Sequence, residues 1–417
     1  MDDRTLYAKL LGLTAPWGVE KVELKLQEGE VHITVALPKK ELWVCPECLE
    51  RAPIHDHNER TWRHLDTFQY KTYVHARVPR LDCPTHGVRQ LRVPWAEEDA
   101  RFTALFEGLL ILWLQQASSV EAVARQAGIS WDQAKGVMDR AVARGLARRP
   151  QEPLRYVGID ETSQRRGHKY FTIVSNLETS KVLQVNDDRK TESLDAFWKT
   201  LTPEQLAGIE AVAMDMWLPY INSTREHLPG ADRKIVFDKF HIAQHLGKAV
   251  DDVRKAEHRE LMAEGKEWLK GTKYLWLHNP EKLTVSKWRA FLRLLKSHSF
   301  RTGRAWAISQ TLMALFDYVY PGVAEKKFRE WYSWAIRSRL EPIKRVARMI
   351  RDHWDNIRTY FEHRITNAGA ESVNALIQKV KRMAHGFRNQ NNFRTAILFH
   401  LGGLDLLPEG ARALQRQ

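Results

Sequence analysis

Long apolar runs are missing from this sequence. No stretch approaches the roughly 18 consecutive apolar residues that a membrane-spanning helix needs. The most apolar segment, residues 106–114, is short and contains Glu107. The N-terminus, MDDRTLYAKL, has acidic residues where a secretory signal has a basic patch followed by an apolar core. These absences argue against membrane and secreted proteins, and we expect a cytoplasmic protein.

Acidic residues are too few to balance the basic ones. The chain has 65 Lys and Arg against 51 Asp and Glu, which gives a formal net charge of +14. This excess favours a polyanionic partner, because the release of counterions from phosphates gives affinity for nucleic acid of any sequence. A merely basic surface is the alternative explanation. Hydrophobic residues make up 43% of the 417 residues, so we expect folded domains, two to four at this length.

Cysteine is also scarce, and an odd count of 3 argues against a disulfide framework. Two pairs of metal-binding residues share one spacing: Cys45 and Cys48 in CPEC, and Cys83 and His86 in CPTH. Such a Cys3His set suits structural Zn2+, because four protein ligands close the tetrahedral shell. Residues 67–79 alternate as strands do, which predicts a small zinc-ribbon-like module. Free buried thiols are one alternative. Another histidine could also replace His86: His55, His57 or His64.

A helix-turn-helix pattern follows the cysteines. Ser118 or Ser119 is suited to cap a helix, and Gly128 stands where a sharp turn needs a permissive backbone. Ser130 then caps a second helix that runs to about Leu146. In DNA-binding proteins the second helix of this motif enters the major groove, although any helical hairpin with a glycine turn looks similar. We expect DNA contacts from four residues of this helix: Trp131, Lys135, Arg140 and Arg144.

The middle of the chain alternates between strand and helix patterns. Three apolar segments follow one another without a helix between them, at 156–160, 169–175 and 181–185. Strand patterns at 208–215 and 234–238 then alternate with helical ones. An antiparallel run followed by alternating strands and helices predicts an α/β sheet of the RNase H-like type.

Aspartates end two of these predicted strands, Asp160 and Asp215. Adjacent strand ends bring carboxylates within a few ångströms of each other, and like charges at that distance need a cation. Oxygen ligands favour Mg2+ or Mn2+. Such ions stabilise the oxygens of a phosphoryl displacement. A turn-forming role explains one such aspartate better than it explains two. A third carboxylate is Glu371, on a predicted helix, although a solvated helix acid has the same pattern. The basic residues that follow suit phosphates: Lys379, Lys381 and Arg382.

Together these motifs resemble the ISL-three family of insertion-sequence transposases. Besides the cysteine pairs and the helix-turn-helix, four short motifs carry the resemblance: GIDE at 158–161, MDMW at 214–217, FDKFHI at 237–242 and NAGAESVNALI at 367–377. The resemblance covers nearly the whole chain and implies a DDE catalytic triad at Asp160, Asp215 and Glu371. It also implies accessory residues around the triad: Asp238, His241, Asn367 and Asn374.

The expected architecture is a multidomain α/β plus α protein. Asp215 and Glu371 are separated by far more residues than one strand–helix connection needs, and the excess is helical and rich in Trp. Most of these tryptophans are expected in a core, although one could stack on an unpaired base. The expected domains are a zinc-binding module at 1–98 and a helix-turn-helix domain at 99–150. They are followed by the first part of an RNase H-like catalytic domain at 151–248, a helical insertion at 249–353, and a C-terminal helical part of the catalytic domain at 354–417.

The resemblance implies a bacterial enzyme that binds the terminal inverted repeats of double-stranded DNA and joins them to target DNA, with Mg2+ or Mn2+ at the acids and structural Zn2+. We expect a homodimer or larger assembly on DNA, no membrane partner, and association with the nucleoid. Two alternatives remain open: an RNase H-like nuclease that cuts without joining, and an inactive DNA-binding relative. A tyrosine or serine recombinase is disfavoured, because the acids require no covalent protein–DNA intermediate.

Overall fold

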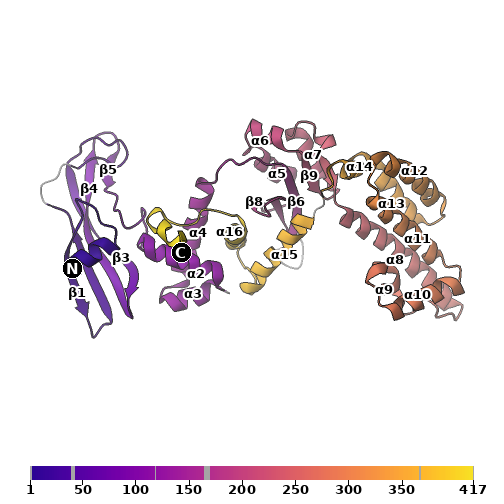
Figure 1. Ribbon diagram of the computed structural model, residues 1–417, viewed down its shortest axis with the longest axis horizontal. Coiled ribbons are helices and arrows are strands. Elements are labelled where there is room, and N and C mark those ends of the chain that lie inside the picture. The colour runs from indigo at the N-terminus through magenta and orange to yellow at the C-terminus, as the bar shows by residue number, and fades with distance from the viewer. Residues whose placement is uncertain (1, 39–42, 118, 164–169, 366–367, 417) are drawn as a thin grey trace. The chain divides into compact units, whose positions relative to one another are not determined.

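Contacts in the computed structural model divide the chain into two units (Figure 1). The structure describes residues 2–38, 43–117, 119–163, 170–365 and 368–416. Unit 1 combines Met1–Pro150 with Val380–Gln417, and unit 2 comprises Gln151–Lys379. The segment 354–417, expected as one part of the catalytic domain, is thus divided between the two units, because its last helices pack on helices of unit 1.

A long antiparallel hairpin dominates the N-terminal part of unit 1. The elements there are α1 (Asp3–Leu10), β1 (Gly18–Lys25), β2 (Glu30–Ala36), β3 (Ile54–Thr67), β4 (Tyr70–Cys83) and β5 (Gly87–Gln90). The sheet has the order β1-β2-β4-β3, and β5 pairs with β4. Phe68 has φ 57°, so the chain turns sharply there, and the strand pattern expected at 67–79 begins with this turn and continues as β4. The core of this part includes three buried tryptophans: Trp17, Trp62 and Trp95.

Helices complete the described part of unit 1: α2 (Ala104–Gln116), α3 (Val120–Ala127), α4 (Trp131–Ala147), α16 (Gln390–Leu401) and the short η4 (Glu409–Arg416). The Ser119 hydroxyl caps α3, Gly128 ends it at φ 64°, and Ser130 opens α4 with a reciprocal capping box. The predicted helix-turn-helix geometry is therefore confirmed. From the C-terminal end of the chain, α16 packs against α4, and η4 packs against α2.

A mixed sheet forms the base of unit 2. Its strands are β6 (Tyr156–Ser163), β7 (Tyr170–Asn176), β8 (Val182–Asn186), β9 (Ala211–Met214) and β10 (Ile235–Phe237), in the order β10-β9-β6-β7-β8. β6, β7 and β8 pair in antiparallel fashion, whereas β9 and β10 run parallel to β6. The connections hold α5 (Thr191–Trp198), α6 (Pro203–Gly208), α7 (Leu218–His227) and η1 (Ala231–Arg233). The predicted order of strands and helices is confirmed.

A series of helices follows β10. Their bounds are α8 (Lys239–Ala263), α9 (Lys273–Leu277), η2 (Pro280–Lys282), α10 (Val285–Ser297), α11 (Arg301–Met313), η3 (Ala314–Asp317), α12 (Pro321–Arg337), α13 (Glu341–Asp352), α14 (Trp354–His363) and α15 (Ala368–Met383). The last of them, α15, extends past the end of unit 2 at Lys379. α8 begins at Lys239, before the expected start at residue 249 and one residue after β10.

Most tryptophans of this region lie in the core, as expected. Trp276, Trp331 and Trp354 are buried, whereas Trp268 and Trp334 are exposed. Within the described ranges, no helix combines the length and the apolar composition needed to cross a bilayer.

Candidate functional site

Three aspartates occupy equivalent positions on neighbouring parallel strands. β6 and β10 both pair with β9, and continuing their register by one or two residues aligns Asp160, Asp215 and Asp238. Asp215 and Asp238 directly follow β9 and β10, as the sequence predicted. Asp160 does not end its strand, so this expectation is corrected. β6 continues to Ser163, because it stays paired with its antiparallel neighbour β7 up to the pair Ser163–Tyr170.

Helix α15 carries the third predicted acid, Glu371, beside β6. Asn374 Nδ2 donates to Oδ2 of Asp160 at 2.7 Å. One turn further along the helix, Gln378 Nε2 donates to Oγ1 of Thr162 at 3.0 Å. Residues three or four apart share a helix face, so Glu371 lies on the same side of α15 as these two amides. The helix is thus fixed to the strand that bears Asp160.

A cavity of about 330 Å³ opens at this place. Its lining is Asp160, Asp238, Phe240, His241, Glu371 and Asn374. His241 also connects Asp215 to the site, since its Nδ1 lies 3.7 Å from Oδ2 of that aspartate. The oxygens of the three predicted catalytic acids do not all lie within 4.8 Å of one another, so in the described structure they form an open arrangement. Asn367, also predicted as an accessory residue, lies outside the described residues.

Burial shifts Asp160 and Asp238 toward their protonated forms. It raises the pKa of Asp160 to about 6, although the backbone N–H of Glu161 partly opposes the shift. Burial also raises the pKa of Asp238, which is only 4% exposed. Asp238 Oδ1 accepts from the N–H of Phe240, whereas Oδ2 has no hydrogen-bond partner among the described residues. A buried carboxylate without a counter-charge favours a bound cation, and an all-oxygen donor set suits Mg2+ or Mn2+.

The four predicted zinc ligands also lie together. Cys45, Cys48, Cys83 and His86 offer ligand atoms within 4.8 Å of one another. Hydrogen bonding from the backbone at Cys48 lowers the pKa of Cys45 to about 7, which favours the thiolate that zinc binds. This Cys3His cluster suits a tetrahedral structural zinc ion. None of the three alternative histidines belongs to the cluster, and His64 instead bonds to a threonine hydroxyl at 2.8 Å.

The residues of α4 that the sequence assigned to DNA differ in what they face. Trp131 is 40% exposed at the first position of the helix. Lys135 is buried and pairs with Asp139. Arg140 is partly exposed and pairs with the buried carboxylate of Glu107. Trp131 and Arg140 therefore remain accessible, whereas Lys135 is largely withdrawn from the surface.

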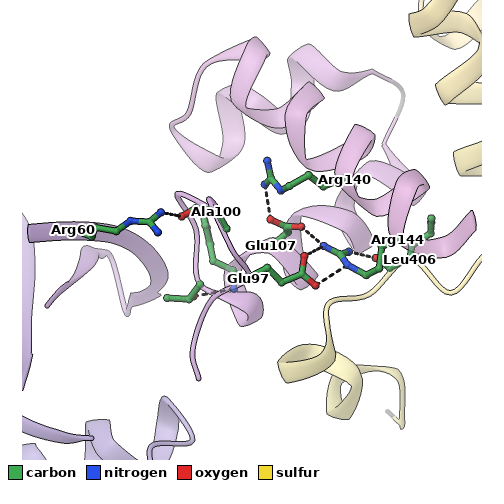
Figure 2. A network of polar contacts seen from close by, with 9 residues as sticks. Arg60, Glu97, Ala100, Glu107, Arg140, Arg144 and Leu406 are labelled. Atoms are coloured by element: carbon green, nitrogen blue, oxygen red, sulfur yellow. Dashed lines mark hydrogen bonds and ion pairs between the residues drawn. The ribbon is translucent and has the colours of Figure 1, made fainter. Parts of the chain in front are cut away.

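Arg144 lies inside unit 1, so the expectation that it faces phosphates is corrected. Its side chain is 7% exposed and donates to Glu107 at 2.7 Å, to Glu97 at 2.8 Å and to the carbonyl of Leu406 (Figure 2). The reason is helical spacing: Arg144 follows the buried Ala141 by three residues and so shares its inward face. The buried Glu107 requires a cation at this position.

The basic residues at the end of α15 differ in their accessibility. Lys379 and Arg382 are exposed, and Lys381 is half-buried. One neighbour of β6 gave no signal in the sequence: Arg189, whose Nε lies 2.7 Å from Oε1 of Glu161. Arg189 belongs to the connection between β8 and α5, and no spacing rule links such a residue to a distant strand.

Comparisons with known proteins agree with this arrangement. Three family models match the chain: a zinc finger of transposases IS204/IS1001/IS1096/IS1165 at 41–86, a helix-turn-helix domain of transposase family ISL3 at 91–142, and a transposase model at 157–397. The chain is 28% identical to the transposase of insertion sequence IS1001 from Bordetella parapertussis, over 94% of this chain and 97% of the relative. It is 27% identical to the transposase of IS1557 from Mycobacterium tuberculosis, over 95% of each chain. The chain therefore belongs to the ISL3 (ISL-three) family of transposases.

Proposed function

We propose that this transposase acts by a metal-dependent DDE mechanism. Asp160, Asp215 and Glu371 would hold Mg2+ or Mn2+, and the enzyme would cut the ends of its element and join them to target DNA. The observation that carries the proposal is the shared cavity, in which an acid from β6 and an acid from α15 meet the buried, partly unpartnered Asp238.

The topology of unit 2 supports an RNase H-like fold. Three antiparallel strands are followed by two that run parallel to the first. The three aspartates stand on or directly after the parallel strands, and Glu371 comes from α15. The helices from 249 to 353 would then be an insertion in this fold. We also propose a zinc-binding module at 1–98 and a helix-turn-helix domain at 99–150. The two parts of the catalytic domain, at 151–248 and 354–417, would flank the insertion.

The residues of the cavity would have distinct roles. A bound divalent cation would supply the charge that stabilises the attacking and leaving oxygens of an in-line displacement. Asn374 orients Asp160 through its hydrogen bond, and His241 lies beside Asp215. Asp238 offers a further buried oxygen. Water would attack during nicking and a 3′-hydroxyl during joining, so no covalent bond between protein and DNA forms.

Of the remaining sites, one would stabilise the fold and the others would bind DNA. The Cys3His cluster would hold one structural Zn2+. Terminal inverted repeats would lie along α4, where Trp131 at its start and Arg140 near its middle are accessible. Lys135 is buried and would contribute its charge from below the surface. Lys379, Lys381 and Arg382, at the end of α15, would bind DNA phosphates. We further propose a homodimer or larger assembly on DNA, in association with the nucleoid.

An oligonucleotide assay separates this function from its rivals. Wild-type protein would be given duplexes that carry the repeats flanking its gene, together with a target plasmid, with and without Mg2+. We expect cation-dependent nicking followed by joined products. Nicking without joining would favour a nuclease, and tight binding that stays inert with both Mg2+ and Mn2+ would favour an inactive relative. A trapped phosphotyrosine or phosphoserine adduct would exclude the DDE mechanism.

A further inference from the structure

A guanidinium group is stacked between two aromatic rings next to the active-site strand. The Arg189 guanidinium carbon lies 4.8 Å from the centre of the Tyr170 ring and 4.7 Å from that of the Trp217 ring. The Trp217 indole N–H donates to the backbone carbonyl of Arg189 at 3.1 Å, which fixes the orientation of the indole. We call Tyr170, Arg189 and Trp217 the aromatic stack.

The positive charge of the stack is already compensated. Arg189 pairs with Glu161 at 2.7 Å, and Glu161 also accepts from the hydroxyl of Tyr220 at 3.3 Å. Tyr220 is buried and bonds in turn to Thr172 Oγ1 on β7 at 2.7 Å. Because Arg189 is held by a carboxylate and two rings, it is a poor candidate for a phosphate contact. It is better suited to support the ring that it stacks on.

Trp217 of the aromatic stack, and Glu161 that pairs with it through Arg189, are near proposed catalytic acids along the chain. Glu161 directly follows Asp160, and Trp217 comes two residues after Asp215. Two residues span at most about 7 Å, so the Cα of Trp217 lies within roughly two base-pair steps of the Cα of Asp215. A tryptophan with its N–H bonded and a cation at its face is typical of a protein core. Trp217 is instead 39% exposed.

We propose that Trp217, supported by Arg189, is a stacking platform for an unpaired nucleobase of the DNA strand that is cut. The proposal rests on the proposed function, since it assigns the base to a nucleotide next to the scissile phosphate. An exposed, rigidly oriented indole suits any base, because every base has a π-face. The sequence had suggested such a role for a tryptophan of the helices 249–353, whereas the geometry points to Trp217 in the MDMW motif.

The test combines protein variants with DNA lacking single bases. Trp217→Ala removes the ring, and Trp217→Leu keeps apolar volume without a π-face. Trp334→Ala on α12 is the matched control, because Trp334 is also 39% exposed and lies in the same unit. Each protein would be assayed for cleavage of end duplexes in which one nucleotide near the scissile bond, in turn, is abasic. Thermal unfolding of each variant would check that it is folded.

The two Trp217 variants should cut intact duplex about five- to a hundredfold more slowly than wild type, and the Trp334 control should not. At one abasic position the difference between wild type and the Trp217 variants should vanish, because there is no base to stack. Equal rates for Trp217→Leu and wild type on intact duplex would overturn the proposal. An unchanged defect at every abasic position would also overturn it.

A second readout separates this proposal from the catalytic one. The fluorescent base 2-aminopurine would be set at that same position, and binding would be followed with Ca2+ in place of Mg2+. Wild type should quench the fluorescence, and Trp217→Leu should not. Quenching by a wild-type protein that never cuts would leave the platform standing and contradict the proposed function. Cleavage without quenching would do the reverse.

Discussion

Replacing Arg144 by alanine tests whether this residue holds unit 1 together or binds DNA. The guanidinium donates to two carboxylates and one carbonyl (Figure 2). Its partner Glu107 is only 1% exposed. Removing one partner of a buried ion pair costs about 3–5 kcal/mol, because the other charge stays buried. Arg140 still contacts Glu107 in the variant, so we expect a loss at the lower end, about 3 kcal/mol.

For a unit of this size, a loss of about 3 kcal/mol corresponds to a fall of roughly 6–12 °C in the melting temperature. Scanning calorimetry would measure it, and faster amide exchange in α2 and α4 would locate it. Arg140→Ala is the matched control. Its side chain is 36% exposed and pairs with the carboxylate of Glu107, so we expect a smaller shift. An Arg144→Ala protein that melts like wild type yet binds the repeats poorly would refute this reasoning and return Arg144 to the DNA interface.

Three other perturbations give distinct results. Cys83→Ser should lower the bound zinc, measured by metal analysis, to well below one ion per chain, because three ligands leave the tetrahedral shell open; a full complement of zinc would contradict the assignment. Asp238→Asn should weaken Mn2+ binding, followed by titration calorimetry, by about 10- to 100-fold; unchanged affinity would leave Asp238 without a role near the cation. Burial lowers the pKa of His64 to about 4, so the unfolded chain binds more protons below its own pKa of 6.5. This histidine should therefore contribute a loss of stability of roughly 3 kcal/mol as the pH falls from about 6.5 to 4. In His64→Asn that part of the pH dependence of the unfolding free energy should disappear; an identical pH profile would show that His64 does not titrate as described.

Local patterns in the sequence were sufficient for much of the fold. Ser119, Gly128 and Ser130 define the two helices of the motif because capping and a left-handed turn are decided by neighbouring residues. The Cys3His cluster was predictable for a similar reason, since a chelating pair needs a fixed short spacing and the three cysteines left few combinations.

Features that depend on distant partners were predicted less well. Asp160 was expected at a strand end, but the length of β6 is set by pairing with β7. Arg144 is of a residue type that often contacts phosphates. It is buried because it pairs with the buried carboxylate of Glu107, 37 residues away. Arg189 gave no signal at all, because its neighbours Glu161, Tyr170 and Trp217 come from three other segments. In each case the chemistry of the residue is visible in the sequence, but its partner is not.

The most direct test of the account is a strand-transfer assay on the three proposed catalytic acids. Asp160→Asn, Asp215→Asn and Glu371→Gln would be compared with wild type, with Mg2+ and with Mn2+. Glu362→Gln, an exposed acid on α14, is the matched control. We expect the three catalytic variants to bind the terminal repeats but to form no joined product, while the control joins like wild type. Joining at wild-type rates by any of the three would contradict the assignment of that acid, and joining without a divalent cation would contradict the mechanism.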